Sequence, residues 1–126
     1  MSKYNRLYNK IGKATGINPM LLQAIALRTT QEDPGAIVCY GHRYYYGLML
    51  LSDYGANLTG FRGNPEQLLD PETNIGFASL YLKYLLQQYN YDLKKGLVAY
   101  LKGRYDSRYS LEAEKIIVLW KRLLNE

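Results

Sequence analysis

Residues 70–89 decide the fold class, and they read DPETNIGFASLYLKYLLQQY. The stretch opens with an aspartate and a proline, an order typical of a helix N-cap and first helical position, where proline's missing N–H is not needed. Behind them the apolar side chains recur three and four residues apart: Ile75, Ala78, Leu82, Leu85, Leu86 and Tyr89. This spacing places them on one face of a helix. We therefore predict a long central helix, with Glu72 and Asn74 as structural residues in its first turns.

More helices are predicted around this one from apolar side chains at helical spacing and from residues that favour helix ends. The first runs from Tyr4 to a stop at Gly16, and the second from the Asn18-Pro19 cap to near Thr30. A short helical piece is predicted at 48–52, and a short helix begins at Asn64-Pro65. After the central helix, one helix contains Leu93, Leu97 and Tyr100, and the last runs from a Ser110 cap to Leu124. Residues 31–46, 55–64 and 102–109 contain glycine and turn residues and are predicted to be loops. No segment predicts a strand, so we expect an all-α fold.

Length and composition indicate one globular domain. The 126 residues fit a single domain spanning 1–126, which we expect to be a monomer, and 48% hydrophobic with 21% charged residues is the balance of a soluble protein. No segment is long and apolar enough to predict a membrane span, and the basic N-terminus has no apolar stretch behind it, so no signal peptide is predicted. Cys39 is the only cysteine, which excludes an internal disulfide, and we expect it to be a buried thiol. With one histidine, His42, expected to be exposed, no metal site or cofactor is predicted.

The net charge of +5 suits a polyanionic partner, although solvated helix faces explain it equally well. A nucleic acid, an anionic membrane and a bacterial wall all meet that description. A basic nucleic-acid-binding helical module stays as an outside alternative, because no helix carries basic residues along one continuous face. Fourteen tyrosines suit both a half-buried core and a surface that stacks on sugar rings or bases, and we expect most of them to be core and boundary residues.

Four segments, in this order, carry a resemblance to a known family. They are Ile17-Asn18-Pro19-Met20-Leu21-Leu22-Gln23-Ala24-Ile25-Ala26, then Gly47-Leu48-Met49, then Asp70-Pro71-Glu72-Thr73-Asn74-Ile75 with Tyr81-Leu82, and finally Ala99-Tyr100 with Gly103. Each one is weak alone, but together they resemble the soluble lytic transglycosylase (SLT) family from about Tyr4 to about Trp120. The resemblance implies a lysozyme-like, goose-type helical domain with a glycan-binding groove. It also implies bacterial peptidoglycan as the partner and action at the cell wall, in the periplasm or outside the cell, as a phage lysin, a secretion-system enzyme or a housekeeping enzyme.

The implied reaction is cleavage of the β-1,4 bond between N-acetylmuramic acid and N-acetylglucosamine, with closure of a 1,6-anhydro ring. One glutamate acts first as the general acid and then as the base. Aligned without gaps from Ala24 to Ala36, the family's Glu-Ser falls on Thr29-Thr30 in this chain. A threonine hydroxyl cannot replace a general acid, and losing that acid costs about two to four orders of magnitude in rate. Enzymatic activity is therefore uncertain, and we expect the domain to be inactive or impaired.

Three interpretations of Thr29 stay open. The first is an engineered knock-out, and the second is a natural pseudo-enzyme that binds cell-wall glycan without cutting it. The third is that Glu32, three residues further on, has taken over the acid role, although Asp33-Pro34 suggests that the helix has ended before it. Apolar residues at Val38, Leu50 and Leu101, where the family has polar ones, are not explained by a single engineered change.

The resemblance also assigns further site residues. Tyr100 corresponds to the tyrosine whose hydroxyl points at the catalytic glutamate. Tyr44-Tyr45-Tyr46 is interpreted either as one wall of the groove or as packing for a long loop. The residues expected to bind substrate are Thr30, Val38, Tyr46, Gly47, Leu48, Met49, Leu50 and Leu101.

Overall fold

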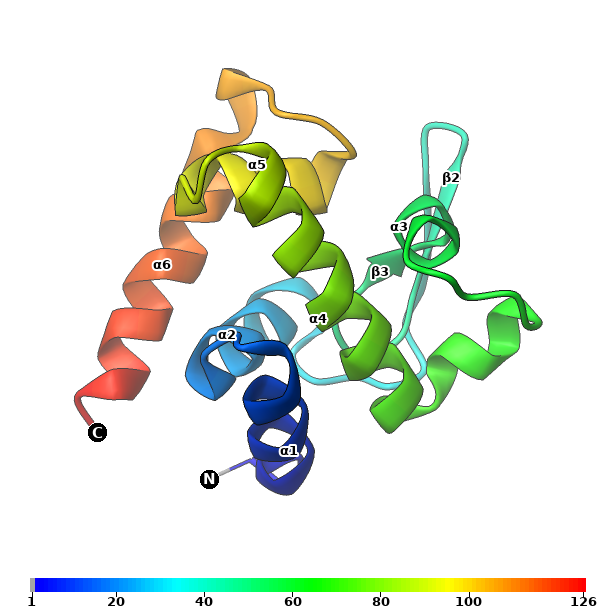
Figure 1. Cartoon of the computed structure of the whole chain (residues 1–126), viewed down its shortest axis with the longest axis horizontal. Coiled ribbons are helices and arrows are strands. Elements are labelled where there is room, and N and C mark those ends of the chain that lie inside the picture. Colours follow the sequence, from blue (N-terminus) through cyan, green and yellow to red (C-terminus); the bar gives the residue numbers. More distant parts are fainter. Residues whose placement is uncertain (1) are drawn as a thin grey trace.

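The chain folds around one long helix in a computed structural model that describes residues 2–126 (Figure 1). The elements in chain order are α1 (Asn5–Thr15), α2 (Pro19–Thr30), β1 (Ile37–Tyr40), β2 (Arg43–Tyr46), β3 (Leu51–Ser52), α3 (Asp53–Leu58), the short 3₁₀ helix η1 (Pro65–Leu69), α4 (Pro71–Gln88), α5 (Leu93–Lys102), the 3₁₀ turn η2 (Ser107–Tyr109) and α6 (Ser110–Leu124). The fold is mainly α-helical, as predicted.

The helix α4 occupies the centre, as the opening stretch predicts. Asp70 caps it by accepting a hydrogen bond from the Thr73 backbone N–H, and Pro71 is its first residue. Its apolar face is buried, and α4 packs against α1, α3 and α5 (Figure 1). No described helix combines the length and the apolar character that crossing a bilayer requires.

The helix α2 leads to the candidate site and ends abruptly. Asn18 caps its start by accepting from the Met20 N–H, with Pro19 in the first position, as predicted. After Thr30 the two residues Gln31 and Glu32 both adopt left-handed backbone conformations, with φ of 55° and 61°. A helix cannot continue through such residues, so the side chain of residue 32 leaves the face that residue 29 occupies.

The prediction of a loop over residues 31–46 was wrong, because the chain forms an antiparallel hairpin there. β1 pairs with β2 in a register that sets Ile37 opposite Tyr46 and Tyr40 opposite Arg43, and the two-residue β3 adds a third strand beside β2. Branched and aromatic residues on both sides of Gly41, whose φ is 63°, favour a hairpin. Cys39 lies on this hairpin and is exposed, so the expectation of a buried thiol was also wrong.

Three smaller expectations also differ from the structure. Residues 48–52 form a turn and the short strand β3, not a helical piece, and residues 53–58 form α3 inside a stretch predicted to be largely loop. The Ser52 side chain caps α3 by accepting from the Gly55 N–H. Ser110 is the first residue of α6, not its cap. In each case the sequence contained a sign of a helix or of its start, but the prediction placed it at a neighbouring position.

Asn74 ties the hairpin to α4, which confirms its structural role. Its side chain is fully buried, and its Nδ2 donates to the carbonyl oxygens of Tyr46 (2.7 Å) and Leu68 (2.9 Å), while its Oδ1 accepts from the Met49 N–H (2.8 Å). Gly47, with φ of 77°, lies so close that a Cβ there would collide with the Asn74 amide and the Leu68 carbonyl. One side chain therefore holds three segments, at residues 46–49, at η1 and at the start of α4.

We expect the fold to lose stability above about pH 10, the ordinary pKa of tyrosine. Burial raises the pKa of Tyr8, Tyr81 and Tyr100, so the folded chain keeps these phenols protonated at pH values where the unfolded chain ionises them. Their contribution is complete below the unfolded pKa and is lost as the pH rises toward the folded pKa, by up to about 1.4 kcal/mol per pH unit for each phenol. Thermal unfolding followed by circular dichroism at about pH 8 and about pH 11 measures this loss. An unchanged Tm across that range would contradict the expectation.

Candidate functional site

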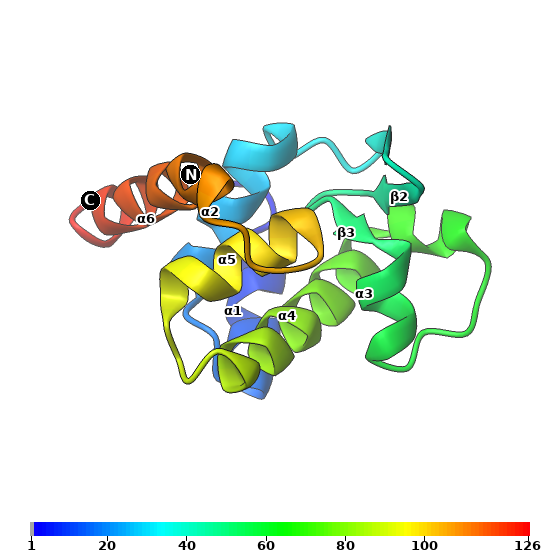
Figure 2. The same ribbon diagram turned by 90° about the horizontal axis from the view of Figure 1, so that it is seen from above.

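Two adjoining cavities form a cleft between the hairpin and the ends of three helices. The first, of about 160 Å³, is lined by Val38, Tyr40, Tyr45, Leu50, Leu101, Lys102 and Glu112. The second, of about 70 Å³, is lined by Arg28, Thr29, Leu101, Glu112 and Ile116. They share Leu101 and Glu112, so we treat them as one feature, the Thr29 cleft. In Figure 2, α5 lies between α6 on one side and the sheet on the other.

Thr29 lies in the last turn of α2 and is half-buried in the cleft. Its Oγ1 donates to the carbonyl oxygen of Ile25, 2.7 Å away, one turn back in the same helix. This back-bonding is a common way for a threonine to satisfy its hydroxyl inside a helix. The position therefore offers the cleft a methyl group and an already bonded hydroxyl, with no acid.

The four positions that the motif alignment predicts to differ from the family come together in this cleft. Val38 lies on β1, Leu50 in the turn before β3 and Leu101 in the last turn of α5, and all three line the first cavity. Leu101 also lines the second cavity beside Thr29. Val38 and Leu101, 63 residues apart along the chain, thus meet with Leu50 in one apolar part of the lining, which we call the apolar floor of the cleft.

Thr30 connects the end of α2 to the turn at residues 47–50. The Thr30 Oγ1 donates to the Leu48 carbonyl (2.7 Å) and accepts from the Asp33 N–H (3.0 Å), so its hydroxyl joins α2 to that turn. Gly47, Leu48 and Met49 are buried, and the structure places them in the core and not in the lining of the cleft.

Tyr100 and Tyr46 line neither cavity of the cleft. The Tyr100 ring is buried, and its hydroxyl donates to the Met49 carbonyl oxygen at 2.7 Å. Its hydrogen bond therefore goes to the backbone of the turn and not to Thr29. The Tyr46 ring is half-buried and stacks on Tyr44 with centroids 6.3 Å apart, so the tyrosine run packs partly on itself.

Glu32 points toward the N-terminal helix. Its carboxylate accepts hydrogen bonds from the Tyr8 hydroxyl at 2.7 Å and from the Ser2 hydroxyl. It lines neither cavity of the Thr29 cleft. The left-handed backbone after Thr30 is the physical reason, since it turns residue 32 toward α1. The structure does not bring Glu32 together with Thr29.

Glu112 is the carboxylate that does line the cleft, and the sequence analysis missed it. It lies in the first turn of α6, is exposed, and borders both cavities. It reaches the cleft because α6 packs along α2, a contact between segments that no local pattern indicates. An acidic residue in the first turn of a helix is ordinary, so its position in the sequence carried no signal.

The rim of the cleft combines an aromatic ring with cations. Tyr40 is exposed and borders the first cavity, and the Lys102 Nζ lies 4.7 Å from its ring centroid and 4.4 Å from that of Tyr109. Arg28 borders the second cavity. The exposed ring can stack on the face of a sugar, and the neighbouring cations can pair with a carboxylate. Residues 2–126 hold no cluster of histidine, cysteine, aspartate and glutamate suited to a metal ion.

The chain is similar to one protein family and to several solved structures. The family model described as "Transglycosylase SLT domain" matches residues 6–116. Among solved structures, an inactive mutant of the lytic transglycosylase Slt from Pseudomonas aeruginosa has a TM-score of 0.79 at 19% identity, over 98% of this chain and 24% of that one. The 70-kDa soluble lytic transglycosylase from Escherichia coli has a TM-score of 0.70 at 26% identity, over 92% of this chain and 22% of that one. A 70-kDa soluble lytic transglycosylase in complex with bulgecin A has a TM-score of 0.71 at 26% identity, over 94% and 20%.

This chain spans less than a quarter of the length of each of these three proteins. At 19% identity the Pseudomonas structure shows the fold alone. No curated protein matches the sequence.

Proposed function

The chain belongs to the transglycosylase SLT domain family, and from this premise we propose that it recognises bacterial peptidoglycan in the Thr29 cleft without cutting it. The lysozyme-like, mainly α-helical fold implied by the resemblance is confirmed by the match to two lytic transglycosylases. The site of action would be the cell wall, in the periplasm or outside the cell. We also propose that the protein acts there as part of a phage virion or lysis system.

One observation carries the proposal. At the position where the family's glutamate is expected, the cleft presents Thr29, whose hydroxyl is already bonded within its own helix. Protonating the leaving oxygen of a glycosidic bond needs a carboxylic acid held in the cleft, and a threonine hydroxyl does not titrate near neutral pH.

The rest of the cleft supports binding. Val38, Leu50 and Leu101 provide an apolar surface for sugar faces and N-acetyl methyl groups, and Tyr40 adds an exposed ring at the rim. Arg28 and Lys102 add positive charge for the carboxylates of the peptide stems. Four coordinated departures from the family pattern favour a natural, remodelled binding domain over a single engineered change.

Co-sedimentation with purified, insoluble peptidoglycan tests the proposal, with DNA as a soluble competitor. We expect the chain to sediment with the wall, and Val38→Asp to weaken binding by about tenfold, because the variant places a charge in the apolar floor. Ile37→Asp is the matched control. Its side chain is 54% exposed, against 42% for Val38, and it points to the opposite face of the same strand, so binding should not change.

Two outcomes of this experiment would contradict the proposal. Equal loss of binding in Val38→Asp and Ile37→Asp would show that the cleft is not the binding surface. Release of the chain from the wall by DNA, with a steep dependence on salt, would favour the nucleic-acid-binding alternative instead.

A second candidate function is an active transglycosylase that uses a different acid. The observation that favours it is the position of Glu112, which borders both cavities of the cleft. In that case the unaltered chain would release anhydro-muropeptides from purified walls, and Glu112→Gln would abolish the release. We expect no release from either protein. Activity that is lost in Glu32→Gln, and not in Glu112→Gln, would instead support Glu32 as the acid.

A further inference from the structure

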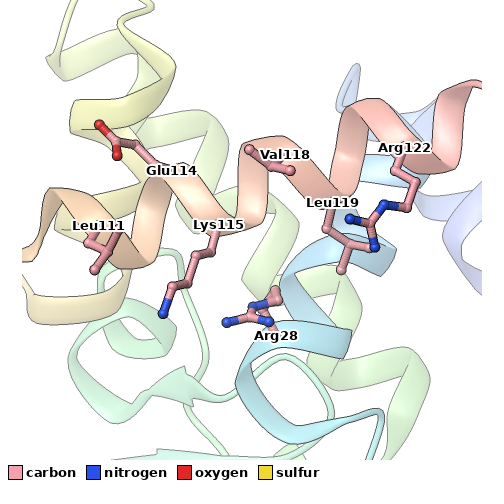
Figure 3. A pocket seen from close by; sticks show the side chains of 7 residues that line it. All are labelled: Arg28, Leu111, Glu114, Lys115, Val118, Leu119 and Arg122. Carbon is pink, nitrogen blue, oxygen red and sulfur yellow. The ribbon is translucent and has the colours of Figure 1, made fainter.

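A second groove lies along α6 and the end of α2 (Figure 3). It has a volume of about 480 Å³ and is lined by Arg28 at the end of α2 and by residues of α6. We call it the α6 groove. Arg28 borders both this groove and the second cavity of the Thr29 cleft, so the two features are neighbours.

The α6 side of the groove alternates apolar and basic side chains. Leu111, Lys115, Val118 and Arg122 follow one another at intervals of four, three and four residues, which places them on a single stripe of the helix. Leu111 is 59% exposed and Val118 is 56% exposed, so neither is used by the core. From residue 111 to residue 122 the stripe is about 16 Å long at 1.5 Å per residue.

The groove has an excess of positive charge. Arg28, Lys115 and Arg122 are exposed, and within residues 2–126 none of them forms an ion pair. Glu114 is the acidic residue of the lining, and its carboxylate pairs with the Lys94 Nζ at 3.1 Å. Figure 3 shows the Lys115 side chain and the Arg28 guanidinium extending toward the same space.

We propose that the α6 groove docks a short acidic, amphipathic helix of a partner protein. Exposed apolar side chains flanked by unpaired cations match a helix with leucine-like anchors on one face and carboxylates beside them. A stripe of about 16 Å accommodates about three turns of such a helix. A simple polyanion would use the cations alone and would gain nothing from Leu111 and Val118. Such docking would place the partner beside the glycan held in the cleft.

Binding of a synthetic peptide to the full chain tests this inference. The probe is a fluorescent helical peptide of about 12 residues, with leucines on one face and glutamates flanking them, followed by fluorescence anisotropy. We expect saturable binding that Val118→Asp weakens by about tenfold and Arg122→Glu by about fivefold, through loss of an apolar anchor and of a charge pair. Leu80→Asp and Lys83→Glu on α4 are matched controls with exposed side chains, and they should leave the affinity unchanged.

Further measurements separate the groove from a general polyanion site and from the glycan cleft. Equal binding of a peptide with lysines in place of its glutamates would overturn the inference, as would an affinity that Val118→Asp does not change. Binding of poly(glycerol phosphate) that depends on Arg122 and equals that of the peptide would also overturn it. We expect Val118→Asp to keep its co-sedimentation with peptidoglycan, so a failure of the groove is distinguishable from a failure of the proposed function.

Discussion

Replacing Thr29 by glutamate is expected to create lytic activity, with anhydro-muropeptide release from purified walls rising from the background of an assay without protein by about two to four orders of magnitude. The new carboxyl group would lie in the half-buried last turn of α2, beside Leu101, Ile116 and Glu112. Apolar neighbours and a like charge both raise the pKa of a carboxyl group, which is what a general acid needs near neutral pH, while Arg28 acts in the opposite direction. Chromatography of the soluble fragments measures the release.

The control for this variant is Thr29→Gln, which has the same length as glutamate and no acid. It should bind the wall as the unaltered chain does and release nothing. If Thr29→Glu folds and sediments with peptidoglycan but releases no fragments, the proposal that the missing acid alone prevents cutting is contradicted. The apolar residues at Val38, Leu50 and Leu101 would then be the next candidates, because they line the same cleft.

Replacing Asn74 by alanine is expected to lower the free energy of unfolding by about 3 to 5 kcal/mol. The substitution leaves two carbonyl oxygens and one N–H, at Tyr46, Leu68 and Met49, without their partner in the interior. Each unsatisfied buried group costs about 1 to 3 kcal/mol, and the truncation adds a small cavity. Urea denaturation followed by circular dichroism gives the free energy directly.

Asn57→Ala is the matched control, because Asn57 is exposed on α3. Its cost should stay within about 0.5 kcal/mol, the usual range for surface substitutions. A loss below about 1 kcal/mol in Asn74→Ala would mean that the three backbone groups find other partners, since one lost hydrogen bond alone costs about that much.

The helices could be predicted from the sequence because their signals are local. Asn18-Pro19 and Asp70-Pro71 each combine a side-chain cap with proline in the first helical position, and Gly16 adopts the left-handed conformation that ends α1. The strands could not be predicted in the same way. Pairing between residues 37–40 and 43–46 depends on a partner strand and on cover from the rest of the fold, so the tyrosine run was interpreted as loop.

The residues of the candidate site also differ in whether a local sequence signal identified them. Thr29, Val38, Leu50 and Leu101 were identified by position within family motifs, and the structure places all four around one cleft. Glu112 and Tyr40 could not be identified, because the packing of α6 on α2 and the hairpin bring them there.

The motif also placed Gly47, Leu48 and Met49 at the predicted site. These residues are buried, and they line neither cavity of the Thr29 cleft.

The most direct test of the central claim is a nuclear magnetic resonance titration of the unaltered chain with a soluble peptidoglycan fragment of alternating N-acetylglucosamine and N-acetylmuramic acid. We predict that the largest shift changes fall on the backbone amides of Thr29, Val38 and Leu101, that the amides of α1 are unaffected, and that the fragment stays intact throughout. Shift changes confined to residues outside the Thr29 cleft, or none at saturating fragment, would contradict the claim that this cleft binds the glycan.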